Sequence, residues 1–168
     1  MSFLKKLLRK QQQTSDVANT KTAPRAPKPI KANLGEVEPS WLEAIVESGS
    51  PTTVAVQKAG APGLSEMETV LVTPDLARQA LKAKQHEQRA DNLAHSHRFQ
   101  EAAKEYKLAI EVAPYEDEIL HMSLGGVLSQ LSQHEEAIHY LEIASQINPH
   151  NNDVVMNLAF AKKKAGKM

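Results

Sequence analysis

Histidines offer the first candidate chemistry in this chain, since a single residue separates His95 from His97, and His134 and His139 follow further along. Imidazole is a common zinc ligand, so this pair and one later histidine would make a three-ligand site. However, the pair falls at a predicted turn between two helices, where polar residues are expected without a metal. We therefore expect no metal site.

Other catalytic chemistry has less support. The chain contains no cysteine, which excludes disulfides, thiolate nucleophiles and cysteine-bound metals. The motifs G-x-S-x-G, G-x-x-x-x-G-K-[ST] and H-E-x-x-H are absent from the sequence. The acidic run at 116–118 stands at a predicted helix start, where the helix dipole favours carboxylates without any catalytic role. We predict that the protein is not an enzyme and uses no cofactor.

The composition favours helices and argues against nucleic acid as a partner. Over 168 residues, 20 Lys and Arg balance 20 Asp and Glu, which leaves no surplus of cations for phosphates. Aromatic residues make up only 4%, too few for the core of a β-sandwich or barrel. Ala, Leu, Glu, Gln and Lys are plentiful and are good helix formers. No apolar run of about 18 residues exists, so we expect no membrane span.

The neutral total hides a basic N-terminal part. Residues 1–35 hold eight basic residues and only one acidic residue, a net charge of +7, so residues 36–168 carry −7. Pro24, Pro27 and Pro29 disfavour a helix in this part. We expect residues 13–73 to be a largely disordered linker with a short helix near 41–48.

Residues 1–12 are expected to form a short basic amphipathic helix. Its apolar stripe is Phe3, Leu4, Leu7 and Leu8, and the cations around it are Lys5, Lys6, Arg9 and Lys10. Such a helix can anchor a protein to an anionic membrane or to a partner. An organelle transit peptide and a frayed tail are the alternatives, and the sequence leaves all of them open.

An internal repeat organises the C-terminal half. At an offset of 35 residues, Leu93 matches Leu128, Ala102 matches Ala137, Ala109 matches Ala144 and Pro114 matches Pro149. Apolar residues at spacings of three and four predict helices at 83–96, 99–112, 117–131, 135–147 and 152–165. Small residues (Ala90, Gly125, Ala102 and Ala137) stand where two helices would cross closely. Each proline ends a second helix, because the residue before proline avoids the α region.

These positions resemble the tetratricopeptide repeat family. The resemblance is carried by Ala90, Leu93, Phe99, Ala102, Tyr106, Ala109 and Pro114, by Leu124, Gly125, Leu128, Ala137, Leu141, Ala144 and Pro149, and by Asn157-Leu158-Ala159 in an incomplete third copy. His86 and His121 depart from the Trp that the family favours, and His134 replaces an aromatic residue. The resemblance implies an all-α, helical-hairpin solenoid of about two and a half repeats over residues 74–168.

The resemblance also implies a non-enzymatic scaffold or adaptor whose concave groove binds a peptide or helix of another protein. By helical phase, the groove candidates are Lys84, Glu87, Asp91, His95, Ile119, Met122, Gly126, Ser129, Met156, Phe160, Lys163 and Lys164. Glu87 and Asp91 would repel a carboxylate, which disfavours the acidic tail of a heat-shock chaperone. The alternative function is a peripheral membrane or organelle-targeted assembly factor. We expect a cytoplasmic protein, either free or peripheral to a membrane.

The segment 36–80 holds an isolated apolar island, Trp41, Leu42, Ile45 and Val46. Ser40 and Glu43 form a capping box for a short helix that Gly49 ends. The β-branched runs at 53–57 and 68–72 are expected to be extended loop, and Thr73-Pro74 begins a helix that continues into the first repeat helix.

Two and a half repeats leave the apolar face of the first helix uncovered, because each hairpin covers its neighbour. We expect the island, including a buried Trp41, or a second copy of the protein to cover this face. The alternative is that Trp41 is an external docking motif.

Overall fold

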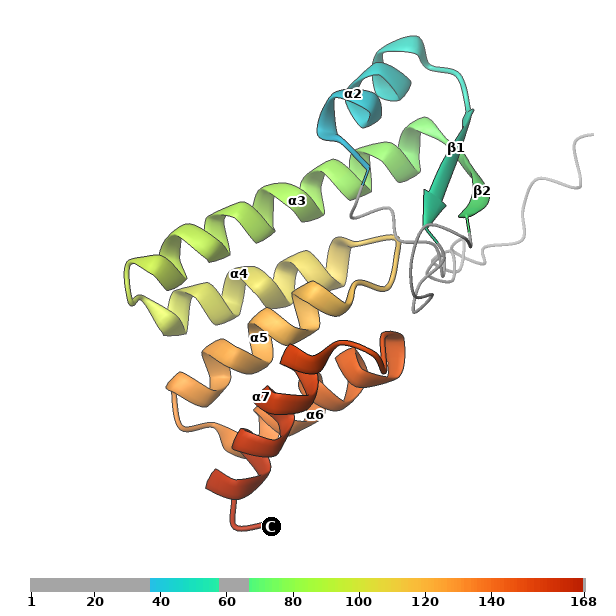
Figure 1. Ribbon diagram of the computed structural model, residues 1–168. Coiled ribbons are helices and arrows are strands. Elements are labelled where there is room, and N and C mark those ends of the chain that lie inside the picture. Colours follow the sequence, from blue (N-terminus) through green and yellow to red (C-terminus); the bar gives the residue numbers. More distant parts are fainter. Residues whose placement is uncertain (1–36, 58–66, 168) are drawn as a thin grey trace, which may run out of the picture.

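The computed structural model describes residues 37–57 and 67–167, which form six helices and one two-stranded antiparallel sheet (Figure 1). In chain order these are α2 (Pro39–Ser48), β1 (Thr52–Gln57), β2 (Met67–Val72), α3 (Pro74–His95), α4 (Phe99–Val112), α5 (Glu118–Gln130), α6 (His134–Ile147) and α7 (Asn152–Lys164). The predicted amphipathic helix at 1–12 and most of the predicted linker lie outside the described residues.

From α3 onward, consecutive helices pack against each other as antiparallel neighbours (Figure 1). The turn after α3 and the turn after α5 have the same geometry, with a left-handed residue at His97 (φ 59°) and at Ser132 (φ 61°). At each turn a backbone N–H reaches five residues back, from Arg98 to Leu93 and from Gln133 to Leu128. This is the Schellman ending of a helix. It recurs 35 residues apart, as do the matched sequence positions.

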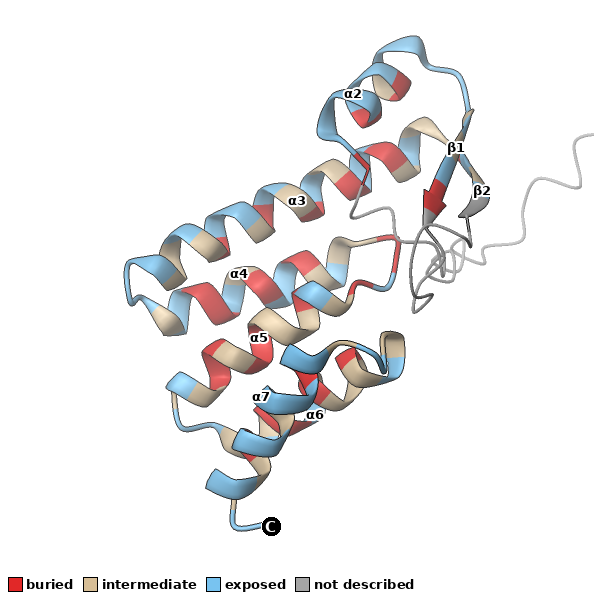
Figure 2. Ribbon diagram, viewed as in Figure 1, coloured by how far each residue is buried: buried red, intermediate tan, exposed pale blue. Residues whose placement is uncertain are grey.

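Small residues allow the paired helices to approach closely, as the sequence predicts. Ala90, Ala102 and Ala137 are fully buried in the larger core, which runs from α3 to α7 (Figure 2). Gly125 shows how tight the fit is, because a Cβ built there would stand 2.6 Å from Cγ of Leu141. A larger residue would therefore push α5 and α6 apart.

The helix ends also follow the sequence. α4 and α6 end just before Pro114 and Pro149, and Ala113 has the extended backbone that a residue before proline requires (ψ 128°). Thr73 caps α3 through a hydrogen bond from the Leu76 N–H, and Asn151 caps α7. α3 is one continuous helix of 22 residues, so the segment from Pro74 does continue into the helix predicted at 83–96.

Residues 37–80 contain more structure than the sequence predicts. β1 and β2 pair in register from Thr52 opposite Val72 to Gln57 opposite Met67, so the expectation of extended loop at 53–57 and 68–72 is wrong. The fold is accordingly mostly helical rather than all-α. Alternating residues of the hairpin, Val54, Val56, Val70 and Val72, face a second core. Each run alone is too short to show whether it forms a strand or a loop. The pairing of the two runs with each other makes them strands.

This second core covers the N-terminal half of α3. Val37, Leu42 and Ile45 are buried there together with Ala77, Ala80 and Tyr115, and α2 packs on α3 (Figures 1 and 2). The expectation that the island covers the first helix is confirmed for Leu42 and Ile45, while Val46 is half-buried beside them.

Two details of the island are corrected. Trp41 is 63% exposed, because it stands at the edge of the face that Leu42, Ile45 and Val46 turn toward the second core. The capping box is also wrong, since α2 begins at Pro39 and its N-cap is Glu38, without a side-chain hydrogen bond. Gly49 ends α2 in the left-handed conformation, as predicted (φ 65°).

Candidate protein-binding face

The predicted groove residues occupy equivalent positions on α3, α5 and α7. Glu87, Met122 and Met156 correspond to one another, as do Asp91, Gly126 and Phe160. We call the set of twelve positions the binding face: Lys84, Glu87, Asp91 and His95 on α3, Ile119, Met122, Gly126 and Ser129 on α5, and Met156, Phe160, Lys163 and Lys164 on α7. His95, Ile119, Met156, Phe160, Lys163 and Lys164 are exposed, and the other six are half-buried.

A polar contact joins α3, α4 and α5 beneath this face. The hydroxyl of Tyr106 donates to the carboxylate of Asp91 and is also hydrogen-bonded by Ser123. Burial, and then the bond to Asp91, raise the pKa of Tyr106, so this phenol stays protonated and keeps donating. The carboxylate of Asp91 is thereby fixed at the inner edge of the binding face.

Glu87 makes the α3 end of the face acidic, and its surroundings disfavour the ionised form of its carboxyl. Burial raises the pKa of this carboxyl, and the nearby charges of Asp117 and Asp91 raise it further, while Lys84 lowers it. Asp117 caps α5 by accepting a hydrogen bond from the Ile119 N–H at 2.8 Å. We call Glu87, Asp91 and Asp117 the acidic patch. Each negative charge in the patch would be stabilised by a cation brought to it.

The α7 end has the opposite character, apolar and basic. Met156 is 62% exposed and Phe160 51%, and the Nζ of Lys164 stands 5.5 Å from the centre of the Phe160 ring. Lys162 and Lys167 are tied to α6 through ion pairs with Glu142 and Glu135. The face therefore runs from carboxylates on α3 to lysines and large apolar side chains on α7.

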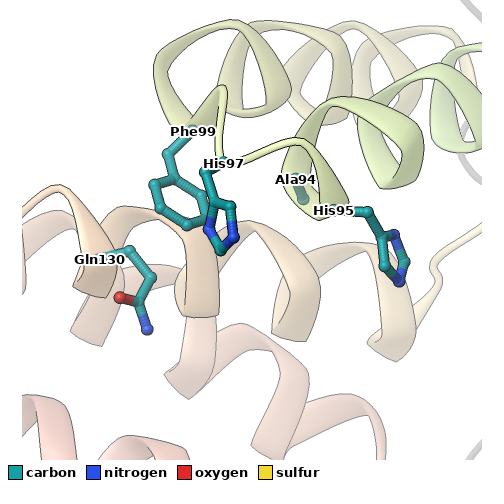
Figure 3. A pocket seen from close by; sticks show the side chains of 5 residues that line it. All are labelled: Ala94, His95, His97, Phe99 and Gln130. Atoms are coloured by element: carbon teal, nitrogen blue, oxygen red, sulfur yellow. The ribbon is translucent and has the colours of Figure 1, made fainter.

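The histidines do not gather around a common point. His97 and Phe99 lie side by side in a shallow pocket at the turn after α3, their rings edge to face with centroids 5.7 Å apart, whereas His95 points away from them (Figure 3). The Nδ1 of His95 instead bonds the backbone oxygen of Asp91 at 2.7 Å. Among the described residues, no three His, Asp or Glu side chains are placed to hold a metal ion.

The polar groups that support the face are not among the residues that the sequence predicts for it. Tyr106 appears in the sequence only as a core position, Ser123 is one position away from the predicted Met122, and Asp117 is read as a helix-dipole residue. Helical phase could have placed Ser123 on the side of α5 that faces α4, but its hydrogen bond with Tyr106 depends on the distance between α4 and α5. Only the packed helices fix that distance.

Within the part of the chain that the structure describes, no helix is long and apolar enough to cross a membrane. The sequence matches no known protein family, and it matches no curated protein.

Proposed function

We propose that this protein is a non-enzymatic adaptor of the tetratricopeptide repeat type, and that it binds a peptide or helix of a partner protein across the binding face. The observation that carries the proposal is the exposed set Ile119, Met156 and Phe160 on two neighbouring helices. Large apolar side chains gathered on a helical face, with charges beside them, are typical of protein-binding surfaces. A cytoplasmic location, free or at a membrane surface, belongs to the same proposal.

The sequence periodicity supports this proposal. The matched positions at an offset of 35 residues, together with two helix endings of the same geometry, agree with an array of helical hairpins. In such an array the first helix of each hairpin contributes to one shared surface. This arrangement assigns to a ligand the twelve positions of the binding face on α3, α5 and α7.

Gly126 provides a sharp test because it lies in the middle of the face and a Cβ there would meet nothing within 4 Å. Gly126→Arg should fill the face while leaving the fold intact. The control is Gln146→Arg, which adds the same side chain at an exposed position of α6. A photo-crosslinking amino acid at position 156 of the full chain then reports capture of a partner in an extract of the source cells.

We expect the same crosslinked partner with the parent and with Gln146→Arg, and its loss with Gly126→Arg at a melting temperature no lower than that of the parent. Equal capture by all three proteins would show that the partner does not use this face.

A further inference from the structure

The described chain begins at Val37, which is packed against the N-terminal half of α3. Val37 is 8% exposed and is packed in the second core with Ala80 and Tyr115. Glu87 follows Ala80 by seven residues on the same helix, a rise of roughly 10 Å. Lys31 precedes Val37 by six residues, and six extended residues span up to about 20 Å. The cations nearest to the fold are therefore within reach of the patch.

Tyr115 adds a second observation at this place. It is 4% exposed, and its hydroxyl has no hydrogen-bond partner among the described residues. The charges of Asp117 and Glu87 act on this hydroxyl and, after burial, are the causes that raise its pKa. An orphaned buried hydroxyl is unusual, because buried polar groups are nearly always paired. It indicates that further polar groups complete this region.

Charge and composition favour one occupant. Residues 17–35 contain Lys21, Arg25, Lys28 and Lys31 and no acidic residue, while residues 36–168 carry −7. Three prolines at 24, 27 and 29 restrict this segment and lower the entropy that is lost when it binds in an extended form. A tether also replaces a weak encounter between molecules with a high effective concentration.

We propose that residues 21–35 are an intramolecular ligand of the acidic patch, held by their cations against the half-buried Glu87 and Asp91, with the charge of the buried Asp117 behind them. A partner must displace this segment to use the α3 end of the binding face. The inference rests on the proposed function, since it concerns occupancy of the same face. The contact would also regulate binding, because raising the salt concentration or neutralising the cations would release residues 21–35 from the face.

Paramagnetic relaxation in the full-length protein tests this contact. Because the chain has no cysteine, Ala26→Cys carries a single nitroxide label, and the amide signals of Glu87 and Asp91 report its approach. We expect these signals to lose intensity at low salt and to recover at about 1 M salt, where the screening length falls to about 3 Å. Signals from the exposed side of α6, such as that of Gln146, should keep their intensity.

Matched variants separate the two sides of the contact. Changing Lys21, Arg25, Lys28 and Lys31 to Gln should abolish the intensity loss without altering any described residue. Glu87→Gln with Asp91→Asn should do the same, whereas Glu43→Gln with Glu47→Gln removes equal charge from exposed positions of α2 and should leave the loss unchanged.

Equal broadening in all of these proteins, or none at Glu87 and Asp91, would overturn the proposal. So would broadening that appears when labelled and isotope-enriched molecules are mixed, because a second copy would then be the occupant. The experiment needs no partner, so its failure leaves the photo-crosslinking test of the binding face unaffected.

Discussion

Two neighbouring glycines in α5 have opposite surroundings, which gives a matched pair of substitutions. A Cβ at Gly125 would stand 2.6 Å from Cγ of the fully buried Leu141, whereas a Cβ at Gly126 would meet nothing within 4 Å. Gly126→Ala should stabilise the protein by about 0.5–1 kcal/mol, since glycine in a helix interior costs that much relative to alanine. Gly125→Ala should instead destabilise it by about 1–3 kcal/mol through overpacking.

Chemical denaturation of both variants measures this difference. Because the intrinsic helix propensity of the two substitutions is the same, the difference between them isolates the contact with Leu141. A stabilising Gly125→Ala would mean that α5 and α6 do not cross as closely as described.

Glu87 should make stability depend on pH. Its carboxyl has a raised pKa in the folded protein, so the folded state favours the protonated form, and this contribution is lost as the pH rises through the folded pKa. Glu87→Gln removes the unfavourable charge. We expect the variant to melt at a higher temperature than the parent at pH 7, with the gain shrinking toward pH 4.

The control for this effect is Glu111→Gln, which changes an exposed glutamate of α4. Its melting temperature should follow that of the parent at both pH values. A Glu87→Gln gain that is independent of pH would point to packing rather than to charge.

At the scale of elements, α2 covers α3 with Leu42 and not with Trp41. Leu42 is fully buried, so Leu42→Ala should cost about 2–5 kcal/mol, as large-to-small changes in a core do. Trp41→Ala should change stability little, and the emission of Trp41, the only tryptophan, should be that of a water-exposed indole. Thermal melts and a fluorescence spectrum of the parent check both statements.

The reverse result, a blue-shifted Trp41 spectrum and a stable Leu42→Ala variant, would require α2 to be rotated on α3. Val46→Ala should lower stability by less than Leu42→Ala and by more than Trp41→Ala, because Val46 is only half-buried.

At the scale of the whole molecule, the net charge of zero is divided between the basic residues 1–35 and the acidic residues 36–168. If residues 1–12 anchor the protein to membranes, changing Lys5, Lys6, Arg9 and Lys10 to Gln should weaken binding to vesicles rich in anionic lipid. Each cation near such a surface contributes about 1 kcal/mol. Co-sedimentation of the full-length parent and the variant measures the change, and vesicles of neutral lipid are the control. Equal sedimentation of both proteins, or none, would remove the membrane anchor.

The sequence alone determined the helices from α3 to α7 and much of how they end. Spacings of three and four fix which side of each helix is apolar, and Thr73, Asn151, Pro114 and Pro149 act on backbone groups only a few residues away. Such local interactions are readable without knowing the rest of the fold. The repeated offset also indicated which positions of α3, α5 and α7 correspond to one another, and the binding face is defined from those positions.

Tertiary structure alone decided the remainder. Residues 52–57 and 67–72 become strands because each supplies hydrogen bonds to the other and apolar side chains to the core around Tyr115. Whether Trp41 or Leu42 is buried depends on the angle at which α2 meets α3. The bond from Tyr106 to Asp91 and the charge of Asp117 on Glu87 join residues that are 15 and 30 positions apart. These interactions depend on distances between helices, and those distances are set by packing rather than by any local pattern.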